Sequence, residues 1–73
     1  MNIAIIGCGL IGNKRAENLS KQHKIIAVCD KNKKNAKKIL KKNKNATFYH
    51  KWKKIFKIKD LDCVIICTPH NLL

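Results

Sequence analysis

The chain has three glycines, and all of them lie in one six-residue window as Gly7, Gly9 and Gly12. An apolar run at 3–6 precedes the window, and a stretch with helical patterning follows it. At a turn from a strand into a helix, the first glycine permits the tight turn and the second lets the backbone approach a phosphate. The third lets the helix pack closely on the strand. The spacing therefore predicts a loop that holds a pyrophosphate group.

Two further features extend this pattern toward a dinucleotide site. The amides of Leu10 and Ile11 fall at the predicted helix N-terminus, where unpaired N–H groups and the helix dipole attract an anion. Asp30 closes the next apolar run, at 25–29, and its carboxylate is expected to bind the adenosine ribose hydroxyls. That carboxylate would repel a 2′-phosphate, which favours NAD over NADP. Lysines directly after Asp30 soften this repulsion, so NADP stays open.

Apolar patterning predicts alternating strands and helices along the chain. Strands are predicted at 1–6, 25–29, 46–49 and 62–67, helices at 11–21 and 33–42, and a short helix or turn at 51–56. Right-handed crossovers then arrange the strands as a parallel sheet in the order 3-2-1-4 with flanking helices, an α/β fold and part of a Rossmann arrangement. The cofactor crevice is expected where the first and fourth strands diverge, with Thr68 and Pro69 beside the glycine window.

Each predicted helix presents an apolar side at helical spacing. These sides are Ile11, Ala16 and Leu19 in the first helix, Ala36, Ile39 and Leu40 in the second, and Trp52, Ile55 and Phe56 in the third. The four cysteines, at positions 8, 29, 63 and 67, are interpreted as small, reduced, buried side chains, and no metal site is expected.

Seventy-three residues form one small domain at most. The chain carries 17 lysine and arginine residues against 4 acidic ones, a net charge of +13. Such a surface attracts polyanions. An alternative hypothesis is therefore a small basic protein that binds nucleic acid or anionic surfaces, supported by aromatic residues among the lysines of 51–59. Helical spacing already explains those aromatic residues, so we interpret the charge as solvated helix faces.

No apolar run approaches the roughly 20 residues that a membrane span needs. No basic leader precedes the first predicted strand, so a cytoplasmic location is expected.

The segments Ile-Ala-Ile-Ile-Gly-Cys-Gly-Leu-Ile-Gly, Val-Cys-Asp and Asp-Cys-Val-Ile-Ile-Cys-Thr-Pro resemble the start of the Gfo/Idh/MocA oxidoreductases. That family includes glucose–fructose oxidoreductase and inositol dehydrogenase, and the resemblance covers essentially the whole chain. It implies that the three glycines hold the pyrophosphate and that Asp30 holds the adenosine ribose. Thr68 and Pro69 would line the nicotinamide side of the crevice, and His70 would form a polar wall of the cofactor pocket.

The sequence also differs from members of this family. Members of the family continue into a Glu-Lys-Pro motif with a catalytic lysine and then into a substrate domain, whereas this sequence stops at Leu73. Residues 1–73 are thus expected to be the first part of the cofactor domain of an oxidoreductase acting on a sugar, polyol or related alcohol by hydride transfer. We assign no catalytic residue and expect no turnover from this chain alone. A cofactor sensor without catalysis is a further hypothesis.

The predicted strand 62–67 is apolar on both faces. Without a fifth strand beside it, its edge would be exposed, and we expect the chain to associate with itself there.

Overall fold

A computed structural model describes residues 1–67, in which strands and helices alternate as the patterning predicts. The elements are β1 (Asn2–Ile6), α1 (Leu10–Leu19), β2 (Lys24–Cys29), α2 (Lys33–Lys42), β3 (Thr47–Tyr49), the 3₁₀ helix η1 (Trp52–Lys57) and β4 (Cys63–Ile66). The predicted bounds of α2 are confirmed, and most other predicted bounds differ by one or two residues, as fraying element ends lead one to expect. No helix within residues 1–67 is long and apolar enough to cross a membrane.

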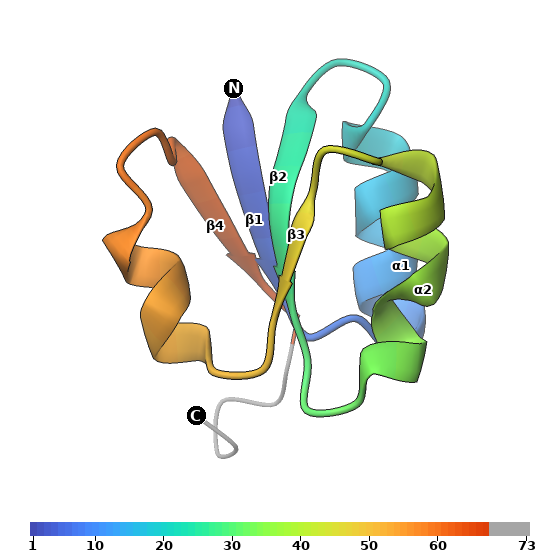
Figure 1. Cartoon of the computed structure of the whole chain (residues 1–73). Helices are drawn as coiled ribbons and strands as arrows, with labels where there is room; N and C mark the ends of the chain where they lie inside the picture. Colours follow the sequence, from blue (N-terminus) through green and yellow to red (C-terminus); the bar gives the residue numbers. More distant parts are fainter. Residues whose placement is uncertain (68–73) are drawn as a thin grey trace.

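The four strands form one parallel sheet in the order β3-β2-β1-β4, which confirms the predicted topology. Ile6 at the end of β1 is aligned with Cys29 of β2 and with Ile66 of β4. The carboxyl ends of the three strands therefore lie at one edge of the sheet. Figure 1 shows α1 and α2 side by side on one face of this sheet and η1 on the other face.

Side chains alternate between two apolar clusters, one on each face of the sheet. Ile3 and Ile5 of β1 pack with Ala16 of α1 and with Ala36 and Ile39 of α2. The intervening β1 residues, Ala4 and Ile6, pack instead with Ile55 of η1. The central strand is thus buried on both sides, as a parallel strand between two helical layers requires.

The predicted inner side of the first helix is wrong at one position. Ile11 is 61% exposed, whereas Gly12 is buried. Gly12, Ala16 and Leu19 are spaced at i, i+4 and i+7, which places them on one helical stripe, and Ile11 lies about 100° away from Gly12. The helix approaches the sheet through its glycine, so a position without a side chain belongs to the packed face.

The third helix also differs from the prediction at one aromatic residue. Ile55 is fully buried and Trp52 is half-buried, but Phe56 is 55% exposed. The segment is a 3₁₀ helix with about three residues per turn, so positions i and i+3 share a face while i+4 is turned away. Trp52, Ile55 and Ile58 accordingly contact the cluster under η1.

Candidate functional site

The glycine loop between β1 and α1 contains two positions that only glycine fits well. Gly7 has a φ of +90°, a backbone conformation that residues with a side chain rarely adopt. A Cβ added to Gly12 would lie 2.0 Å from the carbonyl oxygen of Gly7 and 3.7 Å from Cβ of Cys67. The first turn of α1 therefore lies against the loop itself and next to the carboxyl end of β4.

Gly9 has a different environment. A Cβ added there would have no atom within 4 Å, and the residue is exposed. Gly9 is the N-cap of α1, and no side chain caps the helix. The amides of the first turn, including those of Leu10 and Ile11, have no acceptor within the helix. Open space above uncapped amides at a helix N-terminus is suited to an anionic group such as a pyrophosphate.

Asp30 follows β2 directly and binds the same loop. Its Oδ2 accepts a hydrogen bond from the backbone N–H of Cys8 at 2.8 Å. Its Oδ1 accepts from the N–H of Asn32 at 2.8 Å and from Nδ2 of Asn35 at 3.2 Å. A carboxylate has about four acceptor positions, so Asp30 retains capacity for a ribose hydroxyl. Asp30, which sequence analysis assigned to the ribose, is thus joined by a hydrogen bond to Cys8 of the loop that contains the residues assigned to the pyrophosphate.

Asn13 of α1 also contacts the loop, and sequence analysis did not identify it. Its Nδ2 donates hydrogen bonds to the carbonyl oxygens of Cys8, of Gly9 and of Asn35 in α2. These contacts join the glycine loop to α2, which is distant in the sequence. The type of residue alone carries no signal for them, because an asparagine in the first turn of a helix is also common on solvent-exposed faces.

The thiols near the loop are kept in their neutral form. Cys8 is fully buried, and its Sγ donates to the carbonyl oxygen of Cys29 at 3.5 Å. Burial raises the pKa of Cys8 to about 12, with a smaller contribution from the negative charge of Asp30. Burial also raises the pKa values of Cys29 and Cys67. All four cysteines are free, and residues 1–67 contain no group of three or more His, Cys, Asp or Glu side chains placed to hold a metal ion.

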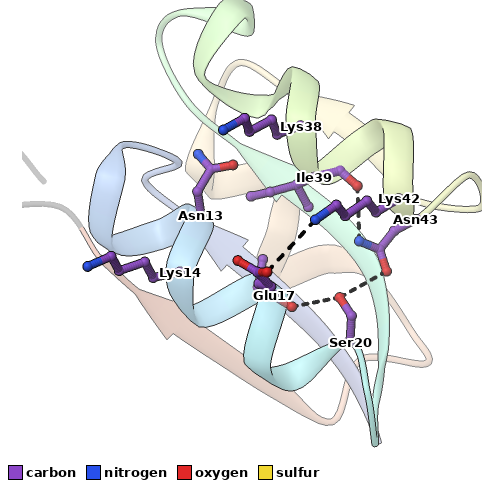
Figure 2. A pocket seen from close by; sticks show the side chains of 9 residues that line it. Asn13, Lys14, Glu17, Ser20, Lys38, Ile39, Lys42 and Asn43 are labelled. Carbon is purple, nitrogen blue, oxygen red and sulfur yellow. Dashed lines mark hydrogen bonds and ion pairs between the residues drawn. The ribbon is translucent and has the colours of Figure 1, made fainter.

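A groove of about 380 Å³ lies between α1 and α2 (Figure 2). Lys14, Lys38 and Lys42 line it together with Glu17, whose Oε1 lies 4.0 Å from Nζ of Lys42. Ser20 and Asn43 also line the groove, and Oγ of Ser20 donates to Oδ1 of Asn43 at 3.2 Å. None of the predicted site residues lines this groove, but Asn13, which is hydrogen-bonded to the glycine loop, does. Thr68, Pro69 and His70 lie outside the described residues.

The family model for the Gfo/Idh/MocA oxidoreductases, an oxidoreductase family with an NAD-binding Rossmann fold, matches residues 1–72. The chain belongs to this family. This confirms the predicted family and fold, and NAD is the cofactor of the family's Rossmann domain. A comparison with curated proteins found no match.

Solved structures agree with this assignment. The WlbA dehydrogenase from Chromobacterium violaceum, determined with NADH and UDP-GlcNAcA, superposes with a TM-score of 0.83 at 28% identity over 99% of this chain and 21% of its own. The myo-inositol dehydrogenase from Lactobacillus casei, determined with NAD(H) and myo-inositol, has a TM-score of 0.84 at 21% identity over 93% of this chain and 21% of its own. The second likeness supports the fold alone. This family member thus spans about a fifth of the length of these structures.

Proposed function

We propose that residues 1–73 form the NAD(H)-binding portion of an oxidoreductase that acts on a sugar, polyol or related alcohol by hydride transfer. The observation that carries this proposal is the hydrogen bond from the Cys8 amide to Oδ2 of Asp30 at 2.8 Å. This hydrogen bond holds Asp30, the proposed acceptor for the ribose hydroxyls, beside the glycine loop, whose amides face open space. The similarity to the dehydrogenase from C. violaceum, which was determined with NADH, supports the same assignment.

Each residue of the loop has a distinct part in the proposal. Gly7 makes the turn, Gly12 brings α1 against it, and Gly9 leaves room for the pyrophosphate. The amides of Leu10 and Ile11 donate to the phosphate oxygens, and Asp30 accepts from the adenosine ribose. Because the Asp30 carboxylate repels a 2′-phosphate, the site prefers NAD to NADP. When bound, NAD accepts or donates the hydride at its nicotinamide ring.

The nicotinamide side of the site is assigned to Thr68 and Pro69, with His70 as a polar wall. Cys67, which precedes them in the sequence, lies beside Gly12, and this position supports the assignment. Residues 1–73 contain no Glu-Lys-Pro motif. We therefore propose that they bind the cofactor and that hydride transfer needs further segments of the enzyme.

The exposed edge of β4 is proposed to mediate self-association. β4 pairs with β1 on one side, and within residues 1–67 no strand pairs with its other side. Ile66 is 49% exposed, and unpaired apolar edges promote association. Sedimentation velocity at increasing protein concentration is expected to show dimers or larger species. A strictly monomeric chain at high concentration would contradict this proposal.

The cofactor proposal is tested by titrating the isotope-labelled chain with NADH at physiological salt and following its amide NMR signals. Shifts are expected at residues 7–12 and at Asp30. Asp30→Ala is expected to weaken binding about tenfold or more, because it removes a charged hydrogen-bond acceptor.

Asp60→Ala is a matched control. Asp60 is exposed, so this variant changes the net charge equally and leaves the loop intact. If both variants bind alike and binding collapses with added salt, the chain is a polyanion-binding protein and the cofactor proposal fails.

A further inference from the structure

A closed ring of hydrogen bonds joins the glycine loop, the end of β2, and both helices on one face of the sheet. The Cys8 amide donates to Asp30, and the Cys8 carbonyl oxygen accepts from Asn13. The same Asn13 amide donates to the carbonyl oxygen of Asn35 at 3.0 Å, and the side chain of Asn35 donates back to Asp30 at 3.2 Å. Four residues from four elements of the chain thereby fix one another's positions.

The orientation of the Asn13 side chain follows from its partners. Three backbone carbonyl oxygens surround its Nδ2, and a carbonyl oxygen can only accept hydrogen bonds. The nitrogen must therefore lie at this end of the amide. This nitrogen has two hydrogens and three acceptor oxygens, so one hydrogen is shared between two of the oxygens. The Cys8 and Gly9 carbonyls belong to consecutive residues of the loop, and both accept from the Asn13 side chain. The Gly9 carbonyl also accepts from the Asn13 backbone N–H at 2.9 Å, so the Cys8 carbonyl is the one that depends on the side chain.

Asn35 contacts the other component of the site, the Asp30 carboxylate. Its Nδ2 reaches Oδ1 of Asp30, while the N–H of Asn32 reaches the same oxygen. Two donors on Oδ1 and one on Oδ2 restrict rotation of the carboxylate about its own bonds. Asn32 also caps α2, because its Oδ1 accepts from the N–H of Lys34 at 3.0 Å. The start of α2 is thus hydrogen-bonded to the Asp30 carboxylate, which is assigned to the ribose.

We propose that Asn13 and Asn35 are positioning residues that hold the glycine loop and the Asp30 carboxylate in their binding arrangement before the cofactor arrives. This inference rests on the proposed cofactor site. A loop and a carboxylate that are already ordered lose less conformational entropy when the ligand binds, and affinity rises accordingly. Neither asparagine needs to touch the cofactor for this effect.

The experiment compares NADH affinity, measured by isothermal titration calorimetry, among variants of the full chain. Asn13→Ala releases the Cys8 carbonyl and removes the link to Asn35, and it is expected to weaken binding about tenfold. Asn35→Ala removes a single bond and is expected to weaken binding about threefold. Alanine is the better helix former, so a loss of helix propensity cannot produce these changes. Asn18→Ala, an exposed position of α1, is the control and is expected to bind like the unmodified chain.

A double-mutant cycle separates positioning from general destabilisation. Asn35 acts through the Asp30 carboxylate, so Asn35→Ala is expected to have no further effect on affinity in an Asp30→Ala background. In the free chain, hydrogen exchange of the Cys8 amide is expected to quicken in both asparagine variants and to stay unchanged in Asn18→Ala. This second measurement requires no cofactor.

The outcomes distinguish the two proposals. If the unmodified chain binds NADH and the asparagine variants bind it equally well, the positioning role is wrong and the cofactor site stands. If Asn35→Ala weakens binding by the same factor with and without Asp30, the residue does not act through that carboxylate and the inference is again overturned. If the unmodified chain does not bind NADH, both proposals fail.

Discussion

The face of the sheet that carries α1 and α2 differs from the face that carries η1 in what holds it together. On the first face, Asp30 and Asn13 hold the glycine loop by hydrogen bonds. Gly12 of α1 also packs against Gly7 of the loop, where a side chain would not fit. On the second face, buried Ile55 packs on the sheet, while Phe56 and Ile66 remain exposed. Apolar contacts have no preferred direction, whereas hydrogen bonds and steric contacts with glycine do. Both faces are stabilised by buried apolar clusters, and the first face is in addition specified by the geometry of these directional contacts.

The largest effect is expected where a side chain is added to the first face. Gly12→Ala would place a Cβ 2.0 Å from the carbonyl oxygen of Gly7. This steric overlap can be relieved only if the helix or the loop moves. We expect a loss of about 4 kcal/mol in the free energy of unfolding, measured by urea denaturation.

Gly9→Ala is the matched control for this prediction. An added Cβ at Gly9 meets open space, so it is expected to change stability by less than about 1 kcal/mol. Equal losses in the two variants would show that steric contact with Gly7 does not define this face.

Truncation on the second face is expected to have the next largest effect. Ile55→Ala removes a fully buried side chain and is expected to lower the free energy of unfolding by about 3 kcal/mol. Phe56→Ala removes a larger side chain that is 55% exposed and is expected to cost less than about 1 kcal/mol. Thermal or urea unfolding measures both. A larger loss at Phe56 than at Ile55 would indicate α-helical packing of this segment.

A smaller effect is expected from pH, through the buried thiol of Cys8. The native pKa is about 12 against an ordinary value of 9.0, so between these values the native state holds a proton that the unfolded chain releases. Stability is therefore full below about pH 9 and falls as pH rises, by about 1 kcal/mol at pH 10. Cys8→Ala is expected to flatten this dependence relative to the unmodified chain.

The sheet order and most element bounds were predictable because they depend on apolar periodicity and on the right-handed crossover rule. The errors at Ile11 and Phe56 have specific causes. Patterning assigns hydrophobic residues to the core, but at the start of α1 the closest approach to the sheet belongs to Gly12. At Phe56, the prediction assumed 3.6 residues per turn, and the chain forms a 3₁₀ helix instead. Neither feature is visible in the hydrophobicity of the residues themselves.

Part of the candidate site could also be predicted from the sequence. Gly7, Gly12 and Asp30 stand out because their spacing matches geometric demands that few residue types meet. The structure adds the hydrogen bond between Cys8 and Asp30 and the contacts of Asn13 and Asn35. The Cys8–Asp30 and Asn13–Asn35 contacts each join residues 22 positions apart in the chain. Local sequence cannot specify which polar groups meet over such a separation.

The sequence by itself determined the order of elements, the position of the glycine loop and the acidic residue that faces it, because periodicity and glycine spacing are local properties. Only the tertiary structure decided how the loop is held. When β1 and β2 align in parallel, Cys8 is brought within hydrogen-bonding distance of Asp30, and the packing of α2 beside α1 places Asn35 against Asn13. The direction of each hydrogen bond depends on where both partners lie in space, and only folding sets both positions at once.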